Sequence, residues 1–242
     1  MRYFIRLAYK GTNYHGWQIQ PNDISVQEEI NNKLSILLKT KTEVVGCGRT
    51  DTGVHAKDYY AHFEGSVENT NQLKYKLNRI LSDDIAIKDV FEVAENMHAR
   101  FSAQSRSYEY HIHQDKSPFK ENQSWYMHEA LNVDLMNEAA KVIIGKKDFS
   151  CFSKSRTNTK TNICDVNQAY WVKNKRDLVF HVTADRFLRN MVRAIVGTLI
   201  DVGIGKLSKE DLEQIIASQD RRNAGISVPA KGLYLSKIEY TF

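Results

Sequence analysis

Hydrophobic and polar residues pass through the same order of elements twice along this chain. In the first half, residues 3–9 alternate as a β-strand does, and Ser25 with Glu28 forms a capping box before apolar residues at helical spacing. The full set of signals is strands at 3–9, 42–46, 58–64 and 84–91, and helices from 26 and around 73–80. Strand, helix, strand, strand, helix, strand is the order of a ferredoxin-like unit.

The second half gives nearly the same order. Its signals are strands at 107–113, 165–172, 177–183 and 232–240, helices around 135–143 and 187–202, and a shorter helix from 208. We therefore predict an α+β fold of two ferredoxin-like (RRM-like) βαββαβ halves, whose antiparallel sheets meet at a central cleft. The boundary is expected within 95–101, which gives an N-terminal domain 1–100 and a C-terminal domain 101–242.

The apolar runs and the cysteines of the sequence bear on the cellular compartment. The 242 residues are 42% hydrophobic, enough for one large domain or two of ordinary size. The opening residues lack the apolar core of a secretory signal, and no run approaches the ~18 apolar residues of a membrane span. Three cysteines without a CxxC pair argue against a disulfide framework. A cytoplasmic protein with reduced thiols is expected.

Positive charge is concentrated in the second half. Residues 1–103 carry 13 basic and 13 acidic side chains, whereas 104–242 carry 21 and 16, which accounts for the whole net charge of +5. Segment 146–193 alone has 11 basic and 4 acidic residues. Basic clusters interleaved with aromatic residues are typical of a protein that binds a polyanion. A solvated basic face is the alternative interpretation.

Residues 46–56, GCGRTDTGVHA, are the most informative stretch for chemistry. Three glycines within eight positions allow a tight turn and a close approach to a ligand. Arg49 and Asp51 lie one residue apart on this loop, and a neighbouring guanidinium favours the ionised carboxylate. An ionised carboxylate can attack or stabilise an electron-poor carbon. A glycine-rich turn with a surface ion pair is the alternative.

Two further groups of residues could meet a nucleic acid. Arg186, Arg189 and Arg193 are spaced to share one face of the predicted helix 187–202, either as a solvated row or as a clamp for phosphate or carboxylate oxygens. Arg193 is flanked by apolar residues, so we expect it to need a buried anionic partner. Tyr108, between Arg106 and Tyr110 on a predicted strand, can stack on a base, although tyrosine also favours strands for packing alone.

Other candidate positions receive plainer interpretations. The opening loop 11–18 could contact RNA or simply connect two elements. His111 and His113 have no further ligands at metal-like spacing, so no metal site is predicted. Cys47 is expected to be a small buried residue.

Four motifs, in order, resemble those of the TruA-type pseudouridine synthases, which modify tRNA. They are GTNYHGWQIQP at 11–21, GRTDTGVHA at 48–56, FSAQSRSYEY at 101–110 and FLRNMVRAIVGTLIDVG at 187–203. The resemblance covers essentially the whole chain. It implies that Asp51 is the catalytic aspartate and Arg49 the arginine before it. It also implies that Tyr108 stacks on the target base and that Arg193 pairs with the aspartate.

The implied reaction is the isomerisation of uridine to pseudouridine at positions 38, 39 and 40 of the tRNA anticodon stem-loop. The resemblance further implies a homodimer, with tRNA as the partner. Asp51 would either bond to C1′ or remove the 2′ proton, and Tyr108 is a candidate for removing the C5 proton. Because no group is transferred and no redox change occurs, no cofactor is expected.

Two other functions stay open at this stage. A non-catalytic RNA-binding protein built from two RRM-like units would explain the repeated pattern, the basic excess and the aromatic residues. A nucleoside hydrolase or glycosidase could also use Asp51, but it would need a second placed carboxylate or a metal to activate water.

Overall fold

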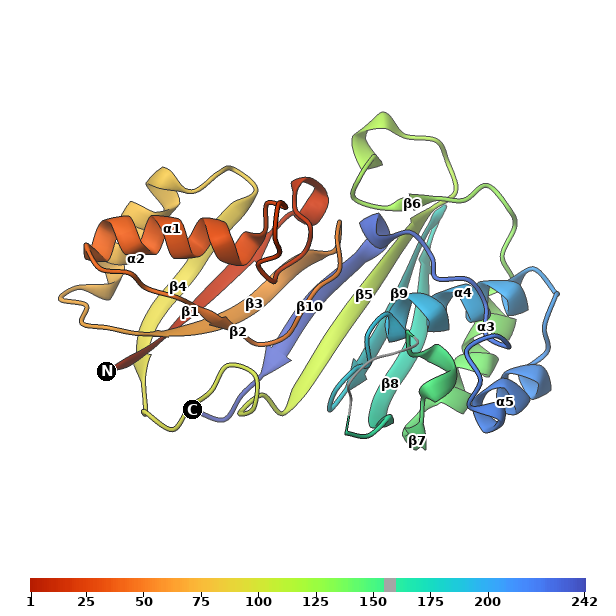
Figure 1. Ribbon diagram of the computed structural model, residues 1–242. Helices are drawn as coiled ribbons and strands as arrows, with labels where there is room; N and C mark the ends of the chain where they lie inside the picture. The colour runs from red at the N-terminus through yellow and green to blue at the C-terminus, as the bar shows by residue number, and fades with distance from the viewer. Residues whose placement is uncertain (155–159) are drawn as a thin grey trace. The chain divides into compact units, whose positions relative to one another are not determined.

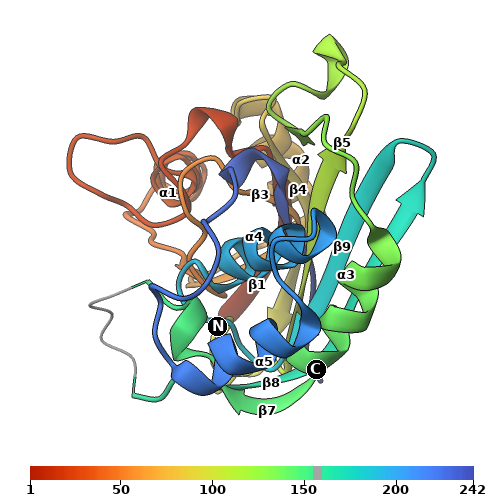
Figure 2. The same ribbon diagram turned by 90° about the vertical axis from the view of Figure 1, so that its right-hand side faces the viewer.

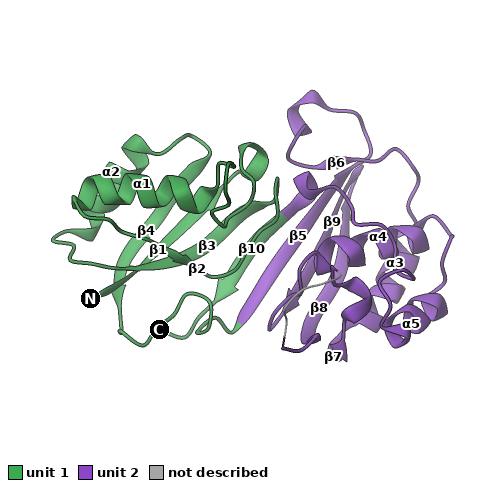
Figure 3. Ribbon diagram, viewed as in Figure 1, with its two compact units in different colours: residues 1–104, 234–242 green, residues 105–233 purple. Residues whose placement is uncertain are grey.

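The computed structural model describes residues 1–154 and 160–242 (Figure 1). The predicted basic segment 146–193 includes residues 155–159, which lie outside the described part. The chain forms two compact units, residues 1–104 with 234–242 and residues 105–233 (Figure 3). Residues 234–242 thus pack with the first hundred residues. The predicted domain division at residue 100 stays a prediction.

The first unit is a sheet with two helices on one face (Figure 1). Strand β1 (Arg2–Tyr9) lies between β3 (His55–Glu64) and β4 (Ile85–Val93), and both pairings are antiparallel. The other edge of β3 pairs with β2 (Val45–Gly46) antiparallel and with β10 (Leu233–Glu239) parallel. The helices are α1 (Val26–Leu38) and α2 (Thr70–Ile80).

Helix α1 begins where its sequence predicts. Ser25 is extended, and its hydroxyl accepts a hydrogen bond from the Glu28 amide at 3.3 Å, which satisfies one of the unpaired donors of the first turn. The helix then buries the residues that its spacing places on one face, namely Val26, Ile30 and Leu34. Burying these aliphatic side chains, at roughly 1.5–3 kcal/mol each, holds α1 against the sheet.

The second unit is built around an antiparallel sheet whose strands run in the order β5, β9, β8, β7. Their bounds are β5 (Ser105–His113), β7 (Gly145–Asp148), β8 (Ile163–Asn174) and β9 (Asp177–Ala184), and the short β6 (Trp125–Tyr126) runs parallel to β5. Helices α3 (Val133–Ala140), α4 (Met191–Gly203) and α5 (Lys209–Ser218) lie on one face (Figure 2). Every second residue of β9 is buried, as expected of a strand with one covered face.

Single-turn 3₁₀ helices occur at connections between these elements. They are η1 (Gly11–Asn13), η2 (Pro118–Lys120), η3 (Lys141–Ile143), η4 (Ser150–Phe152) and η5 (Ala230–Gly232). Among the described residues, no helix is long and apolar enough to span a membrane. The predicted α+β class is confirmed, and the strand pairings are mostly antiparallel.

Candidate active site

The loop that carries Asp51 connects β2 to β3 and is fixed by main-chain hydrogen bonds. The Trp17 amide donates to the Thr50 carbonyl at 3.3 Å, and the Gly53 amide donates to the Tyr14 carbonyl at 3.3 Å. Within the loop, the Val54 amide donates to the Asp51 carbonyl at 3.1 Å. Asp51 is thus held between two anchored neighbours, and its half-buried side chain is set by the backbone around it.

Two glycines allow the chain to pass this loop more closely than a side chain would permit. Gly16 has φ +86°, and a Cβ there would lie 2.3 Å from the Thr50 carbonyl oxygen. A Cβ at Gly46 would lie 2.2 Å from the Tyr59 hydroxyl. Both distances are below any real carbon contact, so the glycines are needed for close approach, and Gly16 also for its left-handed backbone.

Aromatic side chains support the loop from the core. Trp17 stacks on Tyr59 with ring centroids 4.1 Å apart, and the Tyr59 hydroxyl donates to the Gly48 carbonyl at 2.5 Å. The hydroxyls of Tyr9 and Thr50 are hydrogen-bonded at 2.9 Å in a buried contact. Burial raises the pKa of Tyr59 well above its ordinary value, so this hydroxyl stays protonated and remains a donor.

The opening motif is in turn tied to the helices. The Tyr14 hydroxyl donates to Glu29 on α1 at 2.5 Å and is bonded to the Ser82 hydroxyl at 2.7 Å. Burial and the Glu29 carboxylate raise the pKa of Tyr14 to about 12. The same carboxylate accepts from the Ser82 amide at 2.8 Å. Residues 11–17 therefore brace the Asp51 loop, and an RNA contact by this segment stays a prediction.

His55 also supports the loop, and although it lies within the motif at 48–56, the sequence interpretation assigned it no role. Its Nδ1 accepts from the Gly11 amide at 2.9 Å, and its ring stacks on Tyr234 with centroids 4.6 Å apart. The Gly11 contact requires a glycine, because a Cβ there would lie 2.0 Å from the Val54 carbonyl oxygen. An acceptor at Nδ1 leaves the proton of a neutral ring on Nε2.

In the second unit, two tyrosines of β5 have different environments. Tyr108 is half-buried and meets Phe187 edge-to-face, with centroids 5.1 Å apart and planes at 86°. Tyr110 is fully buried, and its hydroxyl donates to the Pro229 carbonyl at 2.8 Å. The two side chains thus differ in burial: Tyr110 packs in the core, whereas Tyr108 is partly exposed and its ring contacts Phe187.

The predicted row of arginines on one helix is wrong. Helix α4 begins at Met191, so Arg186 and Arg189 precede it. Asn190 has φ +67°, a left-handed conformation that an α-helix cannot contain. Arg193 is consequently in the first turn, where its Nε donates to the Val228 carbonyl at 2.6 Å. The amide of Val228 returns a bond to the Arg193 carbonyl at 3.3 Å, so residue 228 orients this arginine.

The segment that orients Arg193 lies tightly against α4. A Cβ at Gly197 would lie 1.9 Å from the Ile226 carbonyl oxygen, and the Gly225 amide donates to the Thr198 hydroxyl at 2.9 Å. The chain around 225–228 therefore rests on a helical position that only glycine can occupy.

Gly197→Ala is expected to destabilise the protein although alanine is the better helix former. The gain in helix propensity is about 1 kcal/mol, whereas the clash forces a backbone shift of the overpacking kind, at ~1–3 kcal/mol. Taking the middle of that range, urea unfolding should show a net loss of about 1 kcal/mol. Gly65→Ala is the control, because its nearest neighbour would be 3.5 Å away. Equal stability of Gly197→Ala and the wild type would refute the packing argument.

The predicted site residues thus fall into two pairs. Arg49 and Asp51 share one loop of the first unit, with Arg49 exposed, and Tyr108 and Arg193 belong to the second unit. The pairing of Arg193 with Asp51 and the roles of all four residues stay predictions. Tyr14, Gly16, Trp17 and Tyr59 are supporting residues that the sequence interpretation did not assign.

The cysteines of the chain are buried and do not form a reactive site. Cys47, Cys151 and Cys164 are free and buried, which confirms the interpretation of Cys47. Burial raises the pKa of the Cys151 and Cys164 thiols to about 12, so neither is a ready nucleophile. In the ranges 1–154 and 160–242, no group of three or more His, Cys, Asp or Glu side chains could hold a metal ion.

Comparison with known proteins identifies the family. A family model described as tRNA pseudouridine synthase matches residues 139–241. The tRNA pseudouridine synthase A of Bacteroides fragilis is 49% identical over 99% of this chain and 96% of its own length. That of Clostridium acetobutylicum is 40% identical, with 98% of each chain covered. The family model and both relatives place the chain in the class of the tRNA pseudouridine synthases. Within it, the chain belongs to the tRNA pseudouridine synthase A family, which confirms the resemblance of the four motifs.

Proposed function

We propose that the protein is an isomerase that converts uridine to pseudouridine in tRNA, at positions 38, 39 and 40 of the anticodon stem-loop. The observation that carries this proposal is the loop of Asp51, fixed at Thr50, Gly53 and Val54 in a member of the tRNA pseudouridine synthase A family. A loop braced so closely favours catalysis, because it fixes a carboxylate before substrate arrives.

Two of the proposed steps use named residues of the chain, Asp51 at the ribose and Tyr108 at C5 of the base. Asp51 acts at the ribose, either by bonding to C1′ or by removing the 2′ proton. The C1′–N1 bond breaks, the uracil turns in the site, and a C5–C1′ bond forms while the Asp51–C1′ bond breaks or, in the other route, the 2′ proton returns. C5 then loses its proton, with Tyr108 as the candidate acceptor, and N1 gains one, which gives pseudouridine. Substrate and product are isomers, so the atoms and electrons balance without a co-reactant.

Recognition of the base is assigned to the second unit. The target nucleotide must leave its stack, at an unstacking cost of a few kcal/mol. Stacking on the Tyr108 ring offsets part of this cost, since one base on an aromatic side chain contributes ~1–3 kcal/mol. We assign Arg193 to hold the Asp51 carboxylate, and Arg49 to contact the RNA beside it.

The proposal extends to architecture and setting. In the first unit the order β4, β1, β3, with β2 on the far edge of β3, supports a ferredoxin-like half. We propose a second such half, a cleft between the two that holds the site, and a homodimer that binds one tRNA through both subunits. A tRNA substrate and bacterial relatives support a cytoplasmic location.

The test is a direct assay of the wild-type protein. Unmodified tRNA with uridines at 38 to 40 is incubated with the protein, and pseudouridine is mapped by chemical sequencing, with cytidines at these positions as the control. We expect pseudouridine at these sites alone. Release of free uracil would support a nucleoside hydrolase instead. Tight binding without a product would support a non-catalytic RNA-binding protein.

A further inference from the structure

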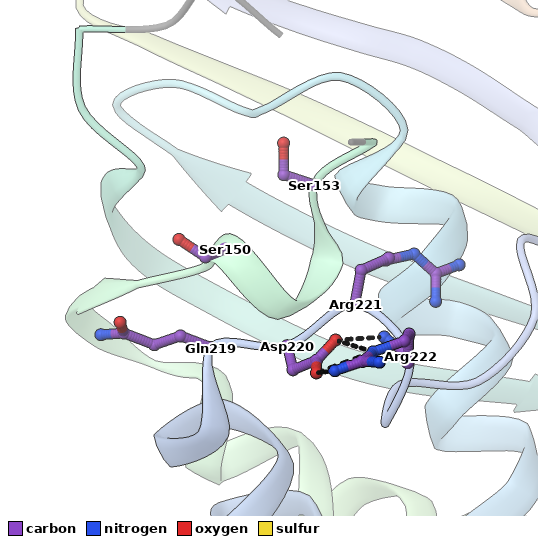
Figure 4. Close-up of a pocket in the computed structure, with 6 residues that line it drawn as sticks. All are labelled: Ser150, Ser153, Gln219, Asp220, Arg221 and Arg222. Carbon is purple, nitrogen blue, oxygen red and sulfur yellow. Dashed lines mark hydrogen bonds and ion pairs between the residues drawn. The ribbon is translucent and has the colours of Figure 1, made fainter. Parts of the chain in front are cut away.

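A surface hollow of about 550 Å³ lies in the second unit, and none of the residues assigned to catalysis lines it. Figure 4 shows the side chains that line it, which come from η4 and the chain that follows α5. They are Ser150, Ser153, Gln219, Asp220, Arg221 and Arg222. Their composition is two hydroxyls, one amide, one carboxylate and two guanidinium groups, with no apolar side chain.

Arg221 carries a charge that no acid of the described chain neutralises. The side chain is half-buried, and it donates from Nη1 to the Ala224 carbonyl at 3.2 Å and from Nη2 to the Ser227 hydroxyl at 3.0 Å. Both acceptors are neutral, and among the described residues no carboxylate lies within ion-pair distance of this guanidinium. A guanidinium remains charged in proteins, so a partly desolvated one is stabilised by an anion.

Asp220 does not supply that anion, because its carboxylate already forms an ion pair with Arg222. The Arg222 Nη2 lies 2.5 Å from Oδ2 of Asp220, and the Nε lies 2.9 Å from the same oxygen. This pair lowers the pKa of Asp220 to about 2. Asp220 and Arg222 therefore cancel, which leaves Arg221 as the one uncompensated charge among the six lining side chains. Asp148, which is not one of the lining residues, accepts a hydrogen bond from the Ser150 hydroxyl at 2.5 Å. The buried Ser153 adds a hydroxyl whose contact, to the Lys154 carbonyl, is long at 3.4 Å.

The hollow is connected to the segment that orients Arg193. Ser227 accepts hydrogen bonds from both Arg221 and Asn190, the residue before α4. The next residue, Val228, holds the Arg193 side chain through its carbonyl. A ligand that fixes Arg221 would thus act on the same short stretch of chain that positions a proposed site residue.

We infer that this hollow binds one phosphate group of the RNA backbone and so sets the register of the tRNA on the second unit. The inference rests on the proposed function. A phosphodiester supplies the single negative charge and the two oxygens that a guanidinium binds side by side, and a serine hydroxyl can donate to a third position. The contact holds RNA of any sequence, because a phosphate carries no base information.

The first experiment compares Arg221→Gln with Arg79→Gln, which removes an exposed arginine from α2. Binding of an anticodon stem-loop RNA is measured over a range of salt concentrations. Arg221→Gln is expected to weaken binding about tenfold and to reduce the slope of log K against log salt by about one, the value for one lost phosphate contact. In turnover, KM for the RNA should rise. Equal behaviour of the two variants would overturn the inference.

A second variant covers the case in which Arg221→Gln fails to fold. Asp220→Asn removes the acid that occupies Arg222, so a second guanidinium becomes available and RNA binding should tighten severalfold. Glu138→Gln is the control, since Glu138 is also paired, with Lys141 at 2.7 Å, on the same unit. If both acid-to-amide variants tighten binding equally, the gain is a general charge effect and the hollow is not a phosphate site.

A third experiment tests whether the bound phosphate belongs to the RNA backbone. Each backbone phosphate of the stem-loop is replaced in turn by an uncharged methylphosphonate. One replacement should weaken binding to the wild type but not to Arg221→Gln, which identifies the contact. If inorganic phosphate alone binds the hollow and no replacement behaves in this way, the RNA contact is refuted. These binding measurements need no catalysis, so they remain decisive even if the protein forms no pseudouridine.

Discussion

Asp51→Asn is expected to give a protein that binds tRNA with wild-type affinity and forms no detectable pseudouridine. An amide has nearly the shape of a carboxylate but neither its charge nor its basicity, so it can neither bond to C1′ nor take the 2′ proton. Loss of an essential nucleophile or base lowers kcat by roughly 10⁴-fold or more. Single-turnover assays with excess enzyme separate this loss from any change in binding.

The structure explains why this substitution should leave the loop intact. The loop is held through the main chain of Thr50, Asp51 and Gly53, and asparagine keeps those bonds. Asp83→Asn, at an exposed position of the same unit, serves as the control for removal of one negative charge. Activity of Asp51→Asn within tenfold of the wild type would remove Asp51 from the chemistry. A parallel loss of RNA affinity and activity would assign it to binding instead.

The sequence predicted the elements whose signals are local. Ser25 marks the start of α1, and the alternation of residues 177–183 appears as a strand with every second side chain buried. The loop of Asp51 could be recognised because its glycines lie close together. Strand β7 could not be predicted, since Gly145–Asp148 has no apolar alternation and is ordered only by pairing with β8.

The predicted start of the helix at residue 187, four residues before α4 begins at Met191, has a different cause. Leu188 and Met191 continue the apolar spacing of the helix backwards, so the pattern extends past the true first residue. The left-handed Asn190, whose amide side chain bonds to Ser227, interrupts the helix through a contact 37 residues away in sequence. The support of the Asp51 loop was hidden for the same reason, because the Tyr14 hydroxyl meets Ser82 across 68 positions.

Gly16→Ala is expected to reduce kcat about a hundredfold while RNA binding is largely kept. Alanine at φ +86° is strained by ~1–3 kcal/mol, and its Cβ would lie 2.3 Å from the Thr50 carbonyl. The backbone beside Asp51 must move to relieve that contact. A displacement near 1 Å at a catalytic group can lower the rate by ~10²-fold. Steady-state assays should therefore show a lower kcat with KM little changed.

Gly205→Ala separates strain from displacement. Gly205 has φ +78°, but a Cβ there would meet no atom within 4 Å, so this variant carries the backbone strain without a clash. Both variants should lose free energy of unfolding in urea through backbone strain, Gly16→Ala more because of its clash, whereas kcat should fall only in Gly16→Ala. If kcat fell equally in both, the loss would follow from stability alone. A Gly16→Ala protein with full kcat would show that the opening motif does not position Asp51.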